Sequence, residues 1–456
     1  MAQSGSSSYQ AHLNTSSSSR GDDGLPSLDS LVNSIRTLEN SASLNTILKS
    51  FAPKDVRDTI LAGALAHGED PLTVLDAPQH TLGILYILSA RLHSSTSPKP
   101  PLESIEDFCT RFDPVQARLA PDRVTSLAKR LVRVSEESHS LKYALGPLFN
   151  LVTRYPPTPS HLTTLHPIFL RTCVATHHFT AALPVLSVPI TTIDTTLSDL
   201  HYNDNLIYHY AGGMAFGALK RWHEAEEFFE ICASAPAQVP AAIQLEASKK
   251  LVLVQLILHG KTIPPPKYTN PVLQRLLKSS PYAAFIKAYP QRTATLHNLI
   301  QKDVETFATE KNLGLVHQAI ERAPRWLIKK LTNTYLTLGL ADIGKEVGLE
   351  EPEVRMVILS MIEADEISAT ISVDGTVTFS DPVPQYSKED VDRMLSLAQE
   401  QSNLLLQLER TMNSNKDYLT KAVKHKDEAG WGPDGEDLFS GPNTSGGGGW
   451  VEDSGF

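Results

Sequence analysis

The fold of this chain is decided by residues 325–381, which read RWLIKKLTNTYLTLGLADIGKEVGLEEPEVRMVILSMIEADEISATISVDGTVTFSD. Apolar residues recur at helical spacing over Trp326–Leu336, Leu340–Val347 and Glu351–Ile362, so three helices are predicted there. The second helix is expected to end at Gly348, because glycine adopts the left-handed conformation of a helix cap at little cost. Three short helices in this order are typical of the first part of a winged helix.

A two-stranded wing is predicted to follow the three helices. Ile367–Ile371 and Thr376–Phe379 alternate between apolar and polar residues, and the hairpin pair Asp374-Gly375 lies between them. A two-stranded wing has unpaired edges that another strand or module is able to cover. The residues predicted to contact a neighbouring subunit through this wing are Ile367, Ile371, Val377 and Phe379.

The third helix of this module has the wrong charge for reading DNA. A winged helix that binds DNA needs Lys and Arg there, since neutralising phosphates supplies most of the affinity. The residues on or beside this helix are instead acidic, with Arg355 as the single base: Glu350, Glu351, Glu353, Glu363, Asp365 and Glu366. The module is therefore predicted to dock proteins. A basic group at Arg322, Arg325, Lys329 and Lys330 leaves contact with an acidic partner or RNA as an alternative.

A helical hairpin of the tetratricopeptide type is predicted upstream, within Tyr208–Cys232. Small residues at the contact positions let two antiparallel helices approach closely, while phenylalanines fill the groove between them. The residues assigned to these structural positions are Gly213, Phe216, Ala225 and Phe229. Weaker helical patterns before and after this segment predict a stack of helical hairpins that ends in the winged helix.

A long amphipathic helix is predicted after the wing, starting at the capping residue Ser387. Its apolar residues follow the alternating three- and four-residue steps of a coiled-coil seam. The seam residues predicted to form an intermolecular bundle are Val391, Met394, Ala398, Leu405, Leu408 and Met412. Packing of this helix back on the chain's own repeats is the alternative.

Composition and pattern together predict several units. The chain has 456 residues, 41% of them hydrophobic, and a net charge of −10, which describes a chain with ample core material and more than one unit. The expected segments are a disordered Ser-rich start (1–26), N-terminal helical repeats (27–200), a tetratricopeptide-like part (201–324), the winged helix (325–381), the long helix (386–425) and a disordered acidic Gly/Trp tail (427–456).

No segment is expected to enter a membrane or to direct secretion. The longest apolar runs, Leu82–Ala90 and Leu251–Leu258, are too short to cross a bilayer, and the Ser-rich start lacks a hydrophobic signal stretch. We therefore expect the chain to stay inside the cell. Cys109, Cys173 and Cys232 are far apart and odd in number, so they are expected to be buried thiols rather than disulfide partners or zinc ligands.

The sequence contains no pattern that predicts catalysis, a metal site or a cofactor. It has no Gly-rich phosphate loop, and His223-Glu224 lacks the second histidine four residues later that a zinc-protease helix needs. The histidine pairs His177-His178 and His161/His166 have no carboxylate or cysteine at ligand spacing. The chain is therefore expected not to be an enzyme, with no catalytic, metal or cofactor residues.

Helical repeats, an acidic winged helix and a C-terminal helix together resemble the PCI-domain scaffold family, which is shared by the proteasome lid, the COP9 signalosome and translation initiation factor three. Short runs between about residues 165 and 371 look like the branch of this family formed by subunit three of the signalosome. In order, these runs are His209–Met214, Glu246–Lys250, Leu258–Lys261, Pro266–Thr269, Gly314–Val316, Leu331–Thr334, Leu336–Leu338 and Met361–Ile367.

This resemblance implies a non-catalytic scaffold whose partners are other PCI subunits of the signalosome. In that family the winged helices join edge to edge, the C-terminal helices gather in one bundle, and another subunit carries the isopeptidase site. The complex removes a ubiquitin-like modifier from cullins (deneddylation), and so regulates cullin-RING ubiquitin ligases and ubiquitin-dependent protein catabolism in the cytoplasm and nucleus. A proteasome-lid PCI subunit and a nucleic-acid-binding PCI protein are the alternatives.

Overall fold

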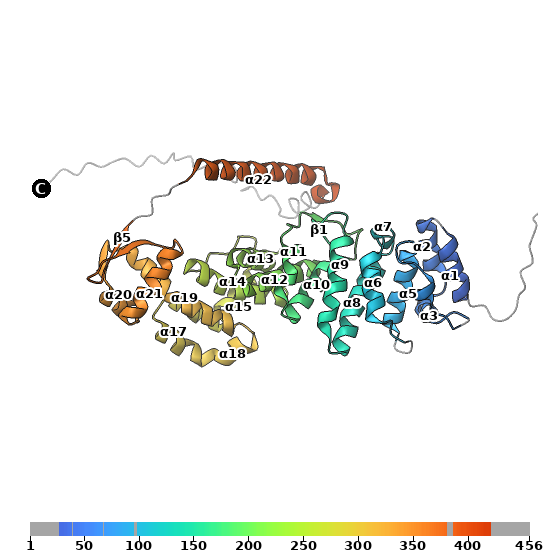
Figure 1. Ribbon diagram of the computed structural model, residues 1–456. Coiled ribbons are helices and arrows are strands. Elements are labelled where there is room, and N and C mark those ends of the chain that lie inside the picture. Colours follow the sequence, from blue (N-terminus) through green and yellow to red (C-terminus); the bar gives the residue numbers. More distant parts are fainter. Residues whose placement is uncertain (1–26, 39, 67, 95–97, 381–385, 421–456) are drawn as a thin grey trace, which may run out of the picture. The chain divides into compact units, whose positions relative to one another are not determined.

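The chain is mostly helical in the computed structural model, which describes residues 27–38, 40–66, 68–94, 98–380 and 386–420 (Figure 1). It divides into two compact units, residues 1–380 and 381–456. The Ser-rich start and the acidic tail, both expected to be disordered, lie outside the described residues. The predicted fold class is confirmed: helical repeats lead into a winged-helix module, and a long helix follows.

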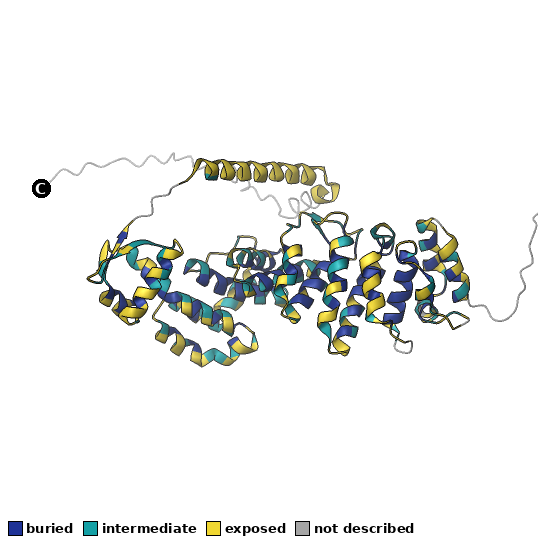
Figure 2. Cartoon of the chain, viewed as in Figure 1, coloured by how far each residue is buried: buried dark blue, intermediate teal, exposed yellow. Residues whose placement is uncertain are grey.

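The first part of unit one is a succession of helices and one short parallel pair of strands (Figure 1). These elements are α1 (Leu28–Thr37), α2 (Ser41–Ser50), α3 (Lys54–Leu61), α4 (Pro71–Val74), α5 (Thr81–His93), α6 (Leu102–Arg111), α7 (Pro114–Ala117), α8 (Pro121–Glu137), η1 (Leu141–Ala144), α9 (Leu145–Arg154), β1 (His161–Leu162), α10 (Leu165–Ala175), α11 (Phe179–Leu186) and β2 (Thr192–Ile193). Helix α5 is buried from Thr81 to Leu92, because α3 and α8 cover its all-round apolar surface (Figure 2).

The second part continues with α12 (Tyr202–Ala218), α13 (Trp222–Ser234), α14 (Ala242–His259), α15 (Pro271–Lys278), α16 (Pro281–Ala288), α17 (Thr293–Ile300), η2 (Gln301–Asp303), α18 (Val304–Thr309) and α19 (Leu313–Thr332). The predicted hairpin is confirmed as α12 and α13. A Cβ added at Gly213 would lie 2.8 Å from the ring of Phe229, so glycine is what allows this approach. Phe216, Ala225 and Phe229 are all buried.

The helical hairpins share a turn that the sequence did not reveal. In the α10–α11, α12–α13 and α18–α19 turns, one residue has a left-handed backbone: His177, Lys220 and Lys311. The following amide closes each turn onto a carbonyl of the preceding helix, as when Arg221 N–H donates to Phe216 O at 2.9 Å. Non-glycine residues occupy these positions, so no glycine signal marks the repeat.

Two helices each contribute to more than one hydrophobic core. The first core runs from Leu28 to Val254, the second from Val252 to Ala323, and the third from Ile328 to Phe379. Helix α14 belongs to the first two cores and α19 to the last two. The expected boundary at residue 200 therefore falls within one continuous core rather than between domains.

Helix α19 also crosses the boundary expected between residues 324 and 325. It continues through Pro324 from the helical part into the winged helix, and ends at Thr332. The predicted extension of this helix to Leu336 is wrong, because Leu336 lies beyond its end and accepts a hydrogen bond from Phe379 N–H at 2.8 Å.

The end of α14 packs directly on α19. Gly260 caps α14 with φ of 69°, and a Cβ at this position would lie 2.6 Å from the Trp326 ring. The Trp326 indole also donates a hydrogen bond to Ile257 O at 3.2 Å. A left-handed glycine thus lets the indole close over the helix end.

A buried polar network ties α14 to the start of α19. Lys250 Nζ donates to Asn312 Oδ1 at 2.6 Å, and the Asn312 amide donates to Tyr282 Oη at 2.6 Å. Lys249 Nζ lies 2.8 Å from Glu246 and 2.6 Å from Glu310. Burial opposes its charge, but these hydrogen bonds outweigh burial and raise the pKa of Lys249. The network fixes two lysines that would be expected on a helix surface.

Substituting Gly260 tests the α14–α19 contact. Gly260→Ala should lower the free energy of unfolding by roughly 1–3 kcal/mol, because alanine disfavours this backbone conformation and its methyl group overlaps the Trp326 ring. Urea unfolding of the full chain measures the change. Gly314→Ala is the matched control in α19, where a Cβ meets no atom within 4 Å. An equal effect of both substitutions would contradict the proposed contact.

Lys250 should make stability depend on alkaline pH. Burial lowers the pKa of Lys250 to about 8, although nearby Glu246 and Glu310 partly oppose this shift. Above that value the unfolded chain, whose lysine pKa is about 10.4, binds more protons than the folded chain, so the contribution of Lys250 to stability rises with pH.

The measurement compares wild type with Lys250→Met by urea unfolding at several pH values. From about pH 7.5 to pH 9.5, the stability difference should move in favour of wild type by about 2 kcal/mol. Taking this difference cancels the contribution of cysteines and tyrosines that titrate in both chains. Parallel pH profiles would show that Lys250 titrates normally in the folded chain.

Candidate docking surfaces

The winged helix is built largely as predicted. Its elements are the end of α19, β3 (Thr337–Gly339), α20 (Leu340–Val347), α21 (Glu351–Glu363), β4 (Ser368–Ile371) and β5 (Thr376–Ser380). Gly348 ends α20 with φ of 81°, and Gly375 takes the left-handed turn position with φ of 80°. Strand β3 was not predicted. It forms because residues 337–339 pair with β5 far along the chain, instead of extending α19.

The third strand changes the role of the wing residues. The sheet order is β3-β5-β4, so β5 lies in the centre and is paired on both sides. Val377 and Phe379 are buried in the module's own core, which contradicts their prediction as contact residues. Ile367 and Ile371 are half-buried and pack against the same core. The premise of a two-stranded wing was wrong.

The outer edge of β4 is the exposed edge of this sheet next to the wing turn. Thr370 is opposite Thr378, and Ser372 N–H donates to Thr376 O at 2.8 Å. Because alternate residues of an antiparallel strand direct their backbone groups to opposite sides, Ala369 and Ile371 direct theirs away from β5. No strand among the described residues pairs with this side of β4. A neighbouring strand would find unpaired donors and acceptors there.

Ion pairing within the module reduces its positive charge. Glu366 Oε1 lies 2.7 Å from Arg322 Nη2 and 3.0 Å from Arg325 Nη1, so one carboxylate is shared by two guanidinium groups. Arg325 also donates to Ser360 Oγ at 2.8 Å. Two of the four residues in the predicted basic group, Arg322 and Arg325, are therefore paired with a carboxylate of the chain itself. Exposed acids remain on and beside α21, namely Glu350, Glu351, Glu353, Glu363 and Asp365, with Arg355 among them.

Unit two contains the predicted long helix, α22 (Lys388–Ser414), and none of its residues is buried (Figure 2). Ser387 caps it as predicted, accepting from Asp390 N–H at 3.1 Å. The helix ends earlier than predicted, because Asn415 adopts an extended backbone and its side chain accepts from Asp417 and Tyr418. Residues 421–425 of the expected helix lie outside the described part.

The predicted seam residues of α22 are all exposed: Val391, Met394, Ala398, Leu405, Leu408 and Met412. The structure adds four exposed leucines that flank this seam, and the sequence analysis did not include them: Leu395, Leu397, Leu404 and Leu406. The apolar face is thus broader than the two positions per heptad of a two-stranded coiled coil. A face of this width fits a bundle of several helices.

The three cysteine thiols and the His166 imidazole are buried. Cys109, Cys173 and Cys232 are buried free thiols, as expected, and burial raises the pKa of all three, to about 12 for Cys173 and Cys232. His166 accepts a hydrogen bond from Thr163 N–H at 3.1 Å, and burial lowers its pKa to about 4. Thiols held in the protonated form are poor nucleophiles.

The described residues contain neither a candidate metal site nor a candidate membrane span. No three His, Cys, Asp or Glu residues among them are grouped so that they could hold a metal ion. No helix in the same residues has the length and apolarity needed to cross a bilayer.

Two family models and two relatives match most of this chain. The family described as COP9 signalosome complex subunit 3, N-terminal helical repeats, matches residues 43–273, and the PCI domain matches residues 297–381. A curated relative from Dictyostelium discoideum, COP9 signalosome complex subunit 3, is 31% identical over 370 residues, 78% of this chain and 88% of the relative. The protein of the same name from Drosophila melanogaster is 29% identical over 429 residues, 88% of this chain and 96% of the relative.

Proposed function

The chain belongs to the family of COP9 signalosome complex subunit 3, and from this premise we propose that it is a non-catalytic scaffold subunit of that complex. The observation that carries the proposal is the β4 edge, which presents unpaired backbone groups on a module of negative outer charge. Such an edge supports docking by strand addition. Other PCI subunits are the proposed partners.

The proposed task of the assembled complex is to remove a ubiquitin-like modifier from cullins, with the isopeptidase in another subunit. Cullin-RING ligases are then indirect partners, reached through the complex, and the sites of action are the cytoplasm and nucleus. The basis for this part of the proposal is family membership.

An assay can separate this function from its alternatives. When the tagged chain is purified natively from its own cells, PCI subunits and an activity that removes the modifier from cullins should co-purify with it. The isolated chain should lack that activity. Proteasomal ATPases, or a salt-dependent complex with nucleic acid, in place of that activity would contradict the proposal.

Assembly through β4 should be sensitive to a single backbone donor. Ala369→Pro removes an N–H that points away from β5, so the ladder within the sheet is retained while the outer edge loses a donor. We expect affinity for the neighbouring PCI subunit to fall by about tenfold or more, measured by titration of purified subunits.

The control for this experiment is Ala369→Ser, which keeps the N–H at the same position. Circular dichroism and thermal melting of both variants should match wild type, because proline is tolerated at the outer edge of a sheet. Wild-type affinity in a correctly folded Ala369→Pro variant would exclude the β4 edge as the interface.

The second proposed contact is a bundle formed by α22. Leu405→Glu combined with Leu408→Glu places two carboxylates on the apolar face, where Leu405 is 66% exposed and Leu408 is 44% exposed. Recruitment of the chain into the complex should be lost or strongly reduced, since burying unpaired carboxylates in a bundle is costly. Co-purification of tagged complexes measures this loss.

The matched control adds the same charge to the polar face of the helix. Asn403→Glu with Gln407→Glu changes positions on the opposite side of α22 and should leave recruitment unchanged. If the leucine variant also assembles normally, α22 does not join an intermolecular bundle, and the alternative of packing within the chain replaces it.

A further inference from the structure

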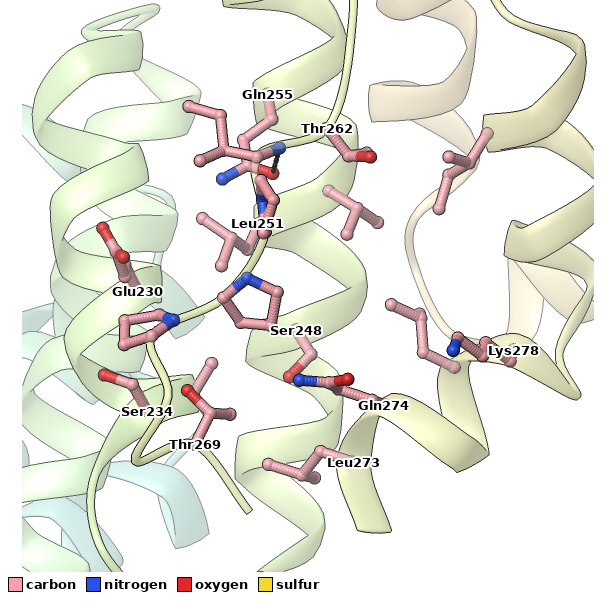
Figure 3. Close-up of a pocket in the computed structure, with 18 residues that line it drawn as sticks. Glu230, Ser234, Ser248, Leu251, Gln255, Thr262, Thr269, Leu273, Gln274 and Lys278 are labelled. Atoms are coloured by element: carbon pink, nitrogen blue, oxygen red, sulfur yellow. Dashed lines mark hydrogen bonds between the residues drawn. The ribbon is translucent and has the colours of Figure 1, made fainter. Parts of the chain in front are cut away.

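A preformed cavity lies in the helical part of unit one (Figure 3). Its volume is about 270 Å³, and its walls are formed by α13, α14, α15 and the segment from Thr262 to Thr269. Most of its lining is apolar, including Leu251, Leu273 and Leu277. The volume lies below the range of about 300–1,000 Å³ typical of small-molecule sites, and suits one large side chain.

The segment that closes the cavity is held at both ends. Ile263 N–H donates to Gln255 Oε1 at 3.1 Å, which attaches the start of the segment to α14. Asn270 donates to Ala237 O at 3.1 Å, which attaches its end to the α13–α14 connection. Between these anchors the wall consists of Pro264–Pro266, whose φ angles are fixed by their rings. The cavity is therefore maintained by its own walls.

One polar group inside the cavity lacks a partner. The Thr269 side chain lines the cavity (Figure 3), and Thr269 is 7% exposed. Its Oγ1 atom is buried and forms no hydrogen bond with any described residue. Buried hydroxyl groups in folded proteins are normally paired, so an unpaired one requires an explanation. A ligand group in the cavity would supply the missing partner once the Thr269 side chain turns its hydroxyl toward the cavity.

One carboxylate at the cavity also lacks an ion-pair partner among the described residues. Glu230 lines the cavity from α13, and no cation among the described residues forms an ion pair with it. Burial, followed by the neighbouring carboxylates Glu226 and Glu227, raises the pKa of Glu230. Lys278 lies on the other side of the cavity on α15, with an exposed side chain (Figure 3). A cation brought by a ligand would balance Glu230.

The segment that closes the cavity also carries exposed apolar side chains. Ile263, which lines the cavity, is 44% exposed, and Tyr268, which does not line it, is 66% exposed. A ligand limited to the cavity would leave Tyr268 uncovered, whereas a polypeptide is long enough to extend over it. Interfaces commonly gain most of their affinity from one aromatic anchor in such a pocket.

We propose that this cavity is a docking site for a partner polypeptide that inserts one aromatic side chain and places a lysine or arginine beside Glu230. The aromatic ring fills the apolar cavity, a backbone or side-chain group of the peptide pairs with Thr269 Oγ1, and the cation neutralises Glu230. No residue of this site belongs to β4 or α22. An experiment that excludes the site would therefore leave the proposed scaffold function intact.

The test uses two blocked peptides with the full chain, acetyl-Lys-Trp-Lys-amide and its charge-reversed counterpart acetyl-Glu-Trp-Glu-amide. Ligand-detected NMR titration should give saturable binding of the basic peptide, at least about fivefold tighter than the acidic one. Glu230→Gln should weaken the basic peptide about fivefold, whereas Glu227→Gln, the control on the same helix, should change its Kd by less than about twofold.

Two further variants separate the cavity from the surrounding surface. Gln274→Trp should fill the cavity and abolish binding, and Thr269→Val, which removes the hydroxyl with little change of shape, should weaken binding while leaving the fold intact. Thermal melting checks the folding of both, and Thr269→Val alone decides if Gln274→Trp misfolds. Absence of saturable binding, equal binding of the two peptides, or full binding by folded Thr269→Val would overturn the proposal.

Discussion

The packing of α14 against α19 is the contact on which the rest of unit one depends. Helix α14 belongs to the first and second cores, and α19 belongs to the second and third, so this pair links all three. The Lys250–Asn312 hydrogen bond fixes the start of α19, and the Trp326 ring over Gly260 fixes its middle. The winged helix is therefore continuous with the repeats, and its β4 edge is presented in one direction rather than on a flexible linker.

Electrostatics within the winged helix favour the same use. Arg322 and Arg325, two cations of α19, share Glu366 and are held against the module, so they are poorly placed to neutralise a polyanion. The exposed acids on and beside α21 then face outward with little compensation. A surface of this charge repels nucleic acid and attracts a basic protein surface, which accords with a module that docks subunits.

The sequence predicted correctly those features that depend on residues close together in the chain. Helices α20 and α21, the Asp374-Gly375 turn and the Gly213–Phe229 approach followed from periodicity, glycine conformation and side-chain size. Features that depend on distant partners were missed: β3 forms only against β5, and Glu366 finds Arg322 across 44 residues. The wrong prediction of Val377 and Phe379 as contact residues has the same cause, because their burial depends on the third strand, which was not predicted. Asn415, which falls inside the expected helix 386–425, instead ends α22 because its side chain caps the next turn.

Hydrogen exchange of the β4 backbone amides would test the central claim most directly. The isolated chain and the assembled complex would be compared with single-residue resolution at Ala369, Thr370 and Ile371. The account predicts that the amides of Ala369 and Ile371 exchange rapidly in the isolated chain and become protected on assembly, while Thr370, directed toward β5, is protected in both states. Unchanged exchange at Ala369 and Ile371 in the complex would show that no neighbouring strand pairs with this edge.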